Sequence, residues 1–139
     1  MKKYLLVLLF LSFACERKEV RINDESDTKN AKELVINFYK ELSNLDTLKI
    51  YNYLDISIPK NGLRKLIVKN NKDYGGITKV DIINISTNYT NINEDVEVKY
   101  EIINLVIYEK VKCEETISFF KKNKENVKLE GYLTKEILE

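Results

Sequence analysis

The stretch Asp95–Ile102, "DVEVKYEI", decides the fold class because charged and apolar residues alternate along it without a break. Successive side chains of a β-strand point to opposite faces of the sheet. The apolar side comprises Val96, Val98, Tyr100 and Ile102, and the charged side comprises Glu97, Lys99 and Glu101. The pattern predicts a strand with one face on a core and the other in water.

Three neighbouring stretches predict further strands, which gives an antiparallel sheet of about four strands. Residues 77–89 are rich in β-branched side chains, 110–120 alternate again, and 127–133 follow a polar turn. The apolar side of 110–120 comprises Val111, Cys113, Ile117 and Phe119. Residues 104–110 contain no Gly, Pro or Asp, so we expect a bulge or a longer, bent strand there.

The charged side of these strands has two interpretations. Glu114 and Glu115 on one strand and Glu97, Lys99 and Glu101 on its neighbour could form cross-strand charge pairs. A metal site would need two or three of the carboxylates to converge. We expect a solvated sheet face and no metal or other cofactor.

Helices are predicted before the strands. Residues 30–46 place an apolar stripe on one helical face, and Asn30 with Glu33 resembles a capping box. The stripe comprises Leu34, Val35, Phe38, Leu42 and Leu45. A short second helix follows over 48–55, and a third begins at Pro59 and ends at Gly75-Gly76.

Helices followed by a run of antiparallel strands predict an α+β fold, with the helices packed on one face of a curved sheet. No internal repeat or second domain is visible, so we expect residues 30–139 to form a single domain.

The N-terminus has the features of an export signal. Lys2 and Lys3 precede a short apolar run that ends at Ala14, and Cys15 follows. The run is far shorter than the roughly 20 residues that a membrane-spanning helix needs. Residues 1–14 resemble a bacterial lipoprotein signal, which implies that Cys15 becomes the first residue and carries lipid. The alternatives are an ordinary cleaved signal and an uncleaved anchor.

A diacylated Cys15 would attach the protein to the membrane without a spanning segment, because two acyl chains hold far more firmly than one. We therefore expect an exported, lipid-anchored protein of the bacterial cell envelope. Residues 15–29 are mostly charged and predict a flexible tether that lifts the domain off the membrane.

Composition excludes several classes of function. The chain has no histidine, which removes Ser-His-Asp and Cys-His catalysis and histidine-bound zinc. Without the two lysines of residues 1–14 the formal charge goes from +1 to −1, which argues against a nucleic-acid partner. Cys113 has no second cysteine to pair with once Cys15 is lipidated, and among apolar residues it is expected in the core rather than as a reactive thiol.

Residues 30–134 resemble small nuclear-transport-factor-2-like domains of the cystatin-like group, which includes ketosteroid isomerase. The resemblance rests on a first helix, an aromatic second helix and a terminal strand. These contain Phe38, Tyr39, Leu42 and Asp46; Tyr51, Tyr53 and Leu54; and Val127, Leu129, Gly131 and Tyr132. The usual tryptophan of the terminal motif is replaced by Val127. The resemblance implies a cone-shaped pocket between the helices and the sheet.

Four residues are candidates to line such a pocket, namely Tyr51, Tyr53, Asp55 and Tyr100. In an apolar cone a carboxylate such as that of Asp55 would have a raised pKa and could accept a proton from carbon. Tyrosines at this spacing are more often core residues, and Asp55 equally suits a turn. We therefore assign no catalytic residue.

Three functions follow from these observations. The first, which we favour, is a non-catalytic interaction or scaffold module that holds an envelope protein. The second is a carrier or sensor of a small apolar ligand, and the third is an enzyme of the isomerase or dehydratase kind. An apolar pocket would favour the second, and a buried carboxylate facing it would favour the third.

Overall fold

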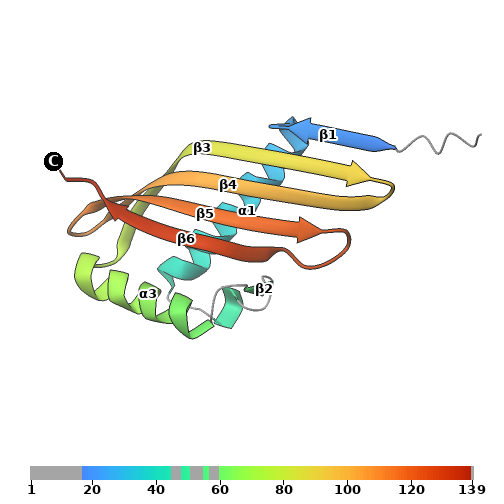
Figure 1. Ribbon diagram of the computed structural model, residues 1–139. Coiled ribbons are helices and arrows are strands. Elements are labelled where there is room, and N and C mark those ends of the chain that lie inside the picture. The colour runs from blue at the N-terminus through green and yellow to red at the C-terminus, as the bar shows by residue number, and fades with distance from the viewer. Residues whose placement is uncertain (1–16, 45–47, 51–54, 57–59, 139) are drawn as a thin grey trace, which may run out of the picture.

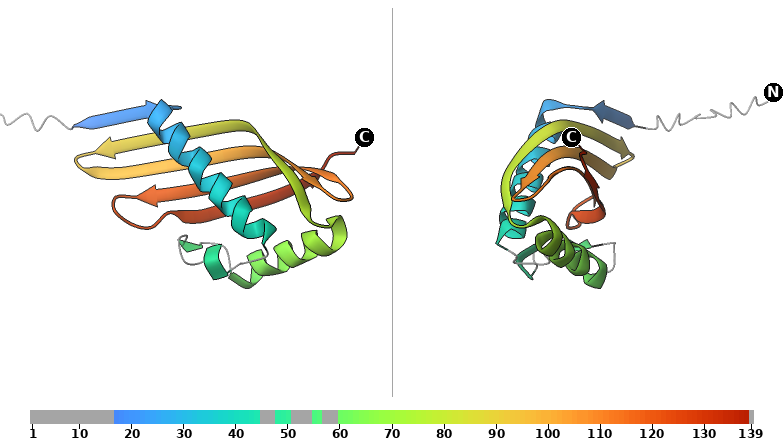
Figure 2. Two further views of the ribbon diagram at one scale, coloured as in Figure 1. Left: turned by 180° about the vertical axis from the view of Figure 1, so that it is seen from behind. Right: turned by 90° about the vertical axis from the view of Figure 1, so that its left-hand side faces the viewer.

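A computed structural model describes residues 17–44, 48–50, 55–56 and 60–138. Along the chain the elements are β1 (Lys18–Ile22), α1 (Glu25–Ser43), β2 (Asp55–Ile56), α3 (Lys60–Tyr74), β3 (Ile77–Ile92), β4 (Asp95–Tyr108), β5 (Lys112–Lys122) and β6 (Lys128–Glu136). The fold is α+β, as predicted. Helix α1 crosses one face of the sheet diagonally, and α3 lies beside its β6 edge (Figures 1 and 2).

The sheet has the strand order β1-β3-β4-β5-β6-β2. β1, β3, β4, β5 and β6 pair antiparallel, and the two-residue β2 runs parallel to β6. The predicted strands correspond to β3, β4, β5 and β6. The expected count of about four is wrong because β1, within a stretch predicted to be a tether, adds a fifth antiparallel strand.

The alternation that predicted β4 is confirmed. Val98, Tyr100 and Ile102 are buried, whereas Lys99 and Glu101 on the other side are exposed. The same inward side continues to the end of β4 and faces α1, whose buried side chains are Asp27, Ala31, Val35, Phe38, Tyr39 and Leu42. Burial of the apolar side chains in this core is the main favourable term in the stability of the fold.

Helix α1 begins five residues earlier than predicted. Asp24 is the N-cap and accepts a hydrogen bond from the backbone N–H of Ser26, so the expected cap at Asn30 lies inside the helix. Residues 18–22 form β1, in register with the end of β3 from Lys18 opposite Ile92. The prediction of a flexible tether over 15–29 is therefore wrong for residues 18–29.

Arg21 explains why this charged stretch is ordered. Its guanidinium donates two hydrogen bonds to Asp27 of α1, at 3.1 and 3.2 Å, and lies 3.6 Å from the centre of the Tyr89 ring of β3. Asp27 is only 4% exposed. A planar guanidinium suits both contacts at once, so Arg21 joins β1, α1 and β3.

For residues 104–110 we expected a bulge or a longer, bent strand, and the structure has a longer strand. β4 runs to Tyr108, and the register shifts lie in β3 instead, between Ile77 and Lys79 and between Ile82 and Asn84. Helix α3 ends as predicted, because Gly75 has a φ of +85°, which favours glycine. Of the second predicted helix, residues 48–50 are helical; Leu45 and residues 51–54 lie outside the described residues.

Candidate functional site

Of the residues predicted to matter, only Tyr100 has a described side chain. Cys15, Tyr51 and Tyr53 lie outside the described residues. The backbone of Asp55 belongs to β2 and pairs with Lys128, and its side chain is not described. Tyr100 is 5% exposed, and burial raises the pKa of its phenol. Tyr100 therefore stands as a core tyrosine, as the simpler interpretation expected.

Glu115 is the residue that the sequence interpretation missed. It lies on the inward side of β5 and is fully buried, so the expectation that it belongs to a solvated face is wrong. Its position was readable: Glu115 has the same strand parity as Cys113 and Ile117, both of which were predicted to face inward. The charge of the side chain concealed that parity.

Four hydroxyl groups converge on the Glu115 carboxylate. Tyr39 of α1 and Tyr132 of β6 each donate to Oε2 at 2.7 Å, and Tyr108 of β4 donates to Oε1 at 2.6 Å. Thr134 of β6 adds a longer contact to Oε1 at 3.3 Å. Short O–H···O distances of this kind are typical of hydrogen bonds to a charged oxygen. We call these five side chains the Glu115 cluster.

Two asparagines surround the cluster. Asn70 of α3 donates to the Thr134 hydroxyl at 3.2 Å, which links α3 to the cluster. Asn104, opposite Glu115 on β4, donates to the backbone carbonyls of Ile102 and Glu115 at 3.5 and 3.4 Å. Its Oδ1 is buried and has no hydrogen-bond partner among the described residues.

The electrostatics make the tyrosines donors. Burial first, and then the neighbouring Glu115 carboxylate, raises the pKa of Tyr39, Tyr108 and Tyr132. The phenols therefore keep their protons at neutral pH, and both carboxylate oxygens are occupied as acceptors. This arrangement links α1, β4, β5 and β6 through one carboxylate.

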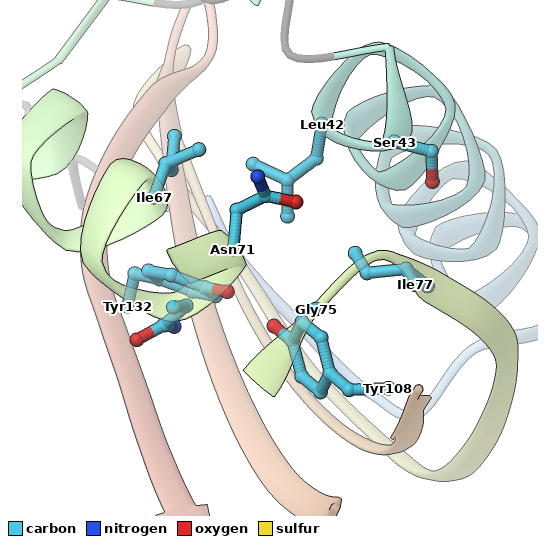
Figure 3. Close-up of a pocket in the computed structure, with 9 residues that line it drawn as sticks. Leu42, Ser43, Ile67, Asn71, Gly75, Ile77, Tyr108 and Tyr132 are labelled. Carbon is cyan, nitrogen blue, oxygen red and sulfur yellow. The ribbon is translucent and has the colours of Figure 1, made fainter. Parts of the chain in front are cut away.

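A small cleft lies beside the cluster (Figure 3). It is lined by Leu42, Ser43, Ile67, Asn70, Asn71, Gly75, Ile77, Tyr108 and Tyr132. Figure 3 shows the hydroxyl ends of Tyr108 and Tyr132 turned toward one another at its wall. The space accessible to the centre of a water-sized molecule is about 20 Å³, which is room for about one water. In this conformation the cleft does not hold an apolar ligand of ordinary size.

A larger groove runs between α1 and β3, with a volume of about 440 Å³. Its lining comprises Lys32, Val35, Ile36, Tyr39, Val80, Asp81 and Ile82. The walls are apolar, and Lys32 and Asp81 contribute one charge of each sign. Ile36 on the helix and Ile83 beside the groove residues of β3 are 52% and 57% exposed. We call this the α1–β3 groove.

The backbone edge of β3 lies open beside this groove. β1 pairs only with Asn88–Ile92, and Asn23 continues the contact to Thr87. From Ile77 to Ser86, β3 pairs with β4 on one side and with no strand of the described chain on the other (Figure 1). We call this stretch the open edge.

The described residues contain no group of three or more Cys, Asp or Glu side chains placed to hold a metal ion. No helix within the described ranges is long and apolar enough to cross a membrane. No protein-family model, curated protein or solved structure matches this chain.

Proposed function

We propose that this chain is a lipid-anchored protein of the bacterial envelope whose domain is a non-catalytic interaction module. The domain binds an extended segment of another polypeptide, which adds as a strand along the open edge. The anchor is the lipid on Cys15, and its support is the signal pattern of residues 1–15.

The open edge is the observation that carries this proposal. A sheet edge presents unpaired backbone N–H and C=O groups, which are a template for another strand. Main-chain hydrogen bonds supply affinity in such complexes, and pockets for alternate side chains supply specificity. Here the α1–β3 groove lies next to the open edge, so alternate side chains of the added strand would enter it.

Charge and irregularity on the open edge favour a selective partner. Lys79 and Asp81 pair with each other at 2.6 Å, and two register shifts interrupt the ladder. Charges and bulges are devices that limit indiscriminate pairing of edge strands. A segment with apolar side chains for Val35 and Val80, and an acidic residue near Lys32, matches the groove best.

A carrier of a small apolar ligand is the second candidate, because the volume of the α1–β3 groove lies within the range of ligand sites. The mass of the protein purified from its own envelope under non-denaturing conditions separates the two functions. Non-peptide mass of a few hundred daltons that is lost when the protein is denatured favours the carrier, because the lipid on Cys15 is covalent and stays. The Glu115 cluster gives an isomerase-like enzyme no such support, since its carboxylate and phenols bond one another.

We also propose that the fold is a nuclear-transport-factor-2-like cone. Helix α1, which crosses one face of the sheet, and α3, which lies beside the β6 edge, both precede β3–β6 and support this assignment. An experimental structure in which the described sheet does not close toward α3 as a cone would contradict it.

Site-specific photocrosslinking in cells tests the interaction function. A photoreactive residue replaces Ile36 in the groove, or Val68 on the exposed side of α3, which is 57% exposed and serves as the matched control. We expect a discrete adduct with another polypeptide at position 36 and none at 68. The Ile83 position should give the same adduct, and Lys32→Glu should abolish it. Equal adducts at 36 and 68, or none at 36, would contradict the proposal.

A further inference from the structure

The first described residue is already fixed to the sheet. The Arg17 carbonyl accepts a hydrogen bond from the Asn93 N–H at 3.0 Å, and the Arg17 N–H donates to Asn93 Oδ1 at 3.2 Å. Asn93 lies in the turn between β3 and β4. Cys15 is two residues from Arg17, so its Cα lies within about 8 Å of the Arg17 Cα, whatever path the chain takes.

The β3–β4 turn belongs to a rigid end of the sheet that includes the β5–β6 turn. Asn123 joins the two turns: its N–H donates to the Val96 carbonyl at 2.8 Å, and its Oδ1 accepts from the Val96 N–H at 2.7 Å. Its side-chain amide also donates to Asp95 at 2.9 Å. Lys122 adds ion pairs to Asp95 and Glu97, both at 3.3 Å. Figure 1 shows the start of β1 and both turns at one end of the sheet.

The chemistry of this end suits a hydrated lipid headgroup layer. Its exposed residues include Asn93, Glu94 and Asp95 at one turn and Asn123, Lys124, Glu125 and Asn126 at the other, and none of these is apolar. Charged and amide side chains oppose insertion into hydrocarbon and are compatible with the hydrated layer of zwitterionic headgroups.

We propose that the two joined turns at Asn93 and Asn123 form the membrane-facing surface of the domain, held against lipid headgroups by Cys15 without an intervening tether. The proposal rests on the lipid anchor of the proposed function. The Glu115 cluster and the Lys135 end of β6 then face away from the anchored end. Through β5, Lys135 is in register with Leu105 of β4, which lies ten residues, or roughly 33 Å of strand, from Asp95.

Fluorescence quenching by headgroup-labelled lipid tests this orientation. The full-length lipoprotein, in a Cys113→Ala background, carries a thiol-linked fluorophore at Lys124→Cys or Lys135→Cys and is reconstituted in phosphatidylcholine vesicles that contain a spin-labelled headgroup. Both lysines are exposed, so the pair is matched in accessibility. We expect loss of most fluorescence at position 124 and little loss at position 135. No loss at 124 in vesicle-bound protein, or equal loss at both positions, would overturn the orientation.

A tether insertion distinguishes anchoring to the membrane from contact between the turns and the headgroups. About 12 Gly/Ser residues inserted between Glu16 and Arg17 should leave vesicle binding intact and abolish quenching at 124, because such a linker reaches roughly 20 Å. Persistent quenching at 124 would contradict the role of the short connection. The mass of the purified protein tests the anchor separately: without lipid on Cys15, the anchor fails and the orientation falls with it.

Discussion

Glu115 is the least expected residue of this molecule. It is fully buried in β5, and the side chains that contact its carboxylate are hydroxyls rather than a cation. Burying a charged carboxylate is costly unless hydrogen bonds replace those of water. Three phenols supply these hydrogen bonds, and the carboxylate is in turn the acceptor for each phenol hydroxyl. The loss of one member therefore leaves the others without a partner.

Glu115→Ala should destabilise the protein by about 3 kcal/mol or more, because it leaves three buried hydroxyls without acceptors. Glu114→Ala on the neighbouring exposed position is the matched control and should change the free energy of unfolding by less than about 0.5 kcal/mol. Urea unfolding followed by circular dichroism gives both values. Equal values for the two variants would show that the cluster does not contribute to stability.

Cys113 should be unreactive in the folded protein. The thiol is fully buried, and burial, followed by the nearby Glu115 carboxylate, raises its pKa to about 11. The folded state thus favours the protonated thiol. The stability that this contributes is fully present below the pKa of the unfolded state and is lost as the pH rises through about 11. At pH 8 an alkylating reagent should add to Cys113 only in urea, as measured by mass spectrometry. Rapid alkylation of the native protein would contradict this.

Helix α1 is the element that joins the Glu115 cluster, the core and the groove. Its Phe38 is fully buried and makes edge-to-face contacts with Tyr39, Phe119 and Tyr132. Aromatic pairs of this kind add to the stabilisation that burial itself gives. The same helix exposes Ile36 in the α1–β3 groove, so one element contributes both to the core and to the proposed binding site.

Phe38→Ala should therefore cost about 3–5 kcal/mol of unfolding free energy. Ile36→Ala on the same helix removes a side chain that is 52% exposed and should cost far less. The denaturation midpoints of the two variants provide the test. A negligible shift for Phe38→Ala would mean that the assigned face of α1 is wrong.

Sequence patterns predicted those elements in which periodicity and burial agree. The alternation of Val98, Tyr100 and Ile102 identified β4 because each inward position is apolar. β1 was missed because an edge strand needs few apolar residues. It is ordered by contacts of Arg21 with Asp27 of α1 and with Tyr89 of β3, which no pattern within residues 18–22 indicates. The strand parity of Glu115 indicated an inward position, but the hydroxyls that allow a carboxylate to be buried there come from α1, β4 and β6, which no local pattern brings together.

At the scale of the whole molecule, the proposed anchor and the proposed binding edge occupy different parts of the sheet. The connection to Cys15 reaches the end of β3 near Asn93, and the open edge begins on the far side of Thr87. A partner could therefore add to β3 while the two joined turns rest on the membrane. The proposed membrane contact and the proposed binding edge thus involve different residues of β3.

The anchor itself is tested by Cys15→Ala. Loss of the acceptor thiol should leave an unprocessed precursor or a soluble form, because lipid addition begins at that sulfur. Fractionation of cells and the mass of the purified protein distinguish the outcomes. A variant that is cut at the same position and stays fully membrane-bound would contradict the lipoprotein assignment.

The central claim is that the open edge of β3 binds a strand from another polypeptide. Hydrogen–deuterium exchange of the full-length lipoprotein, in its own envelope membranes and after purification, measures this most directly. The account predicts that those amides of Ile77–Ser86 that point to the open edge exchange slowly in the envelope and faster in the purified protein, while the central amides of β5 are slow in both. Equal exchange of Ile77–Ser86 in the two preparations would contradict it.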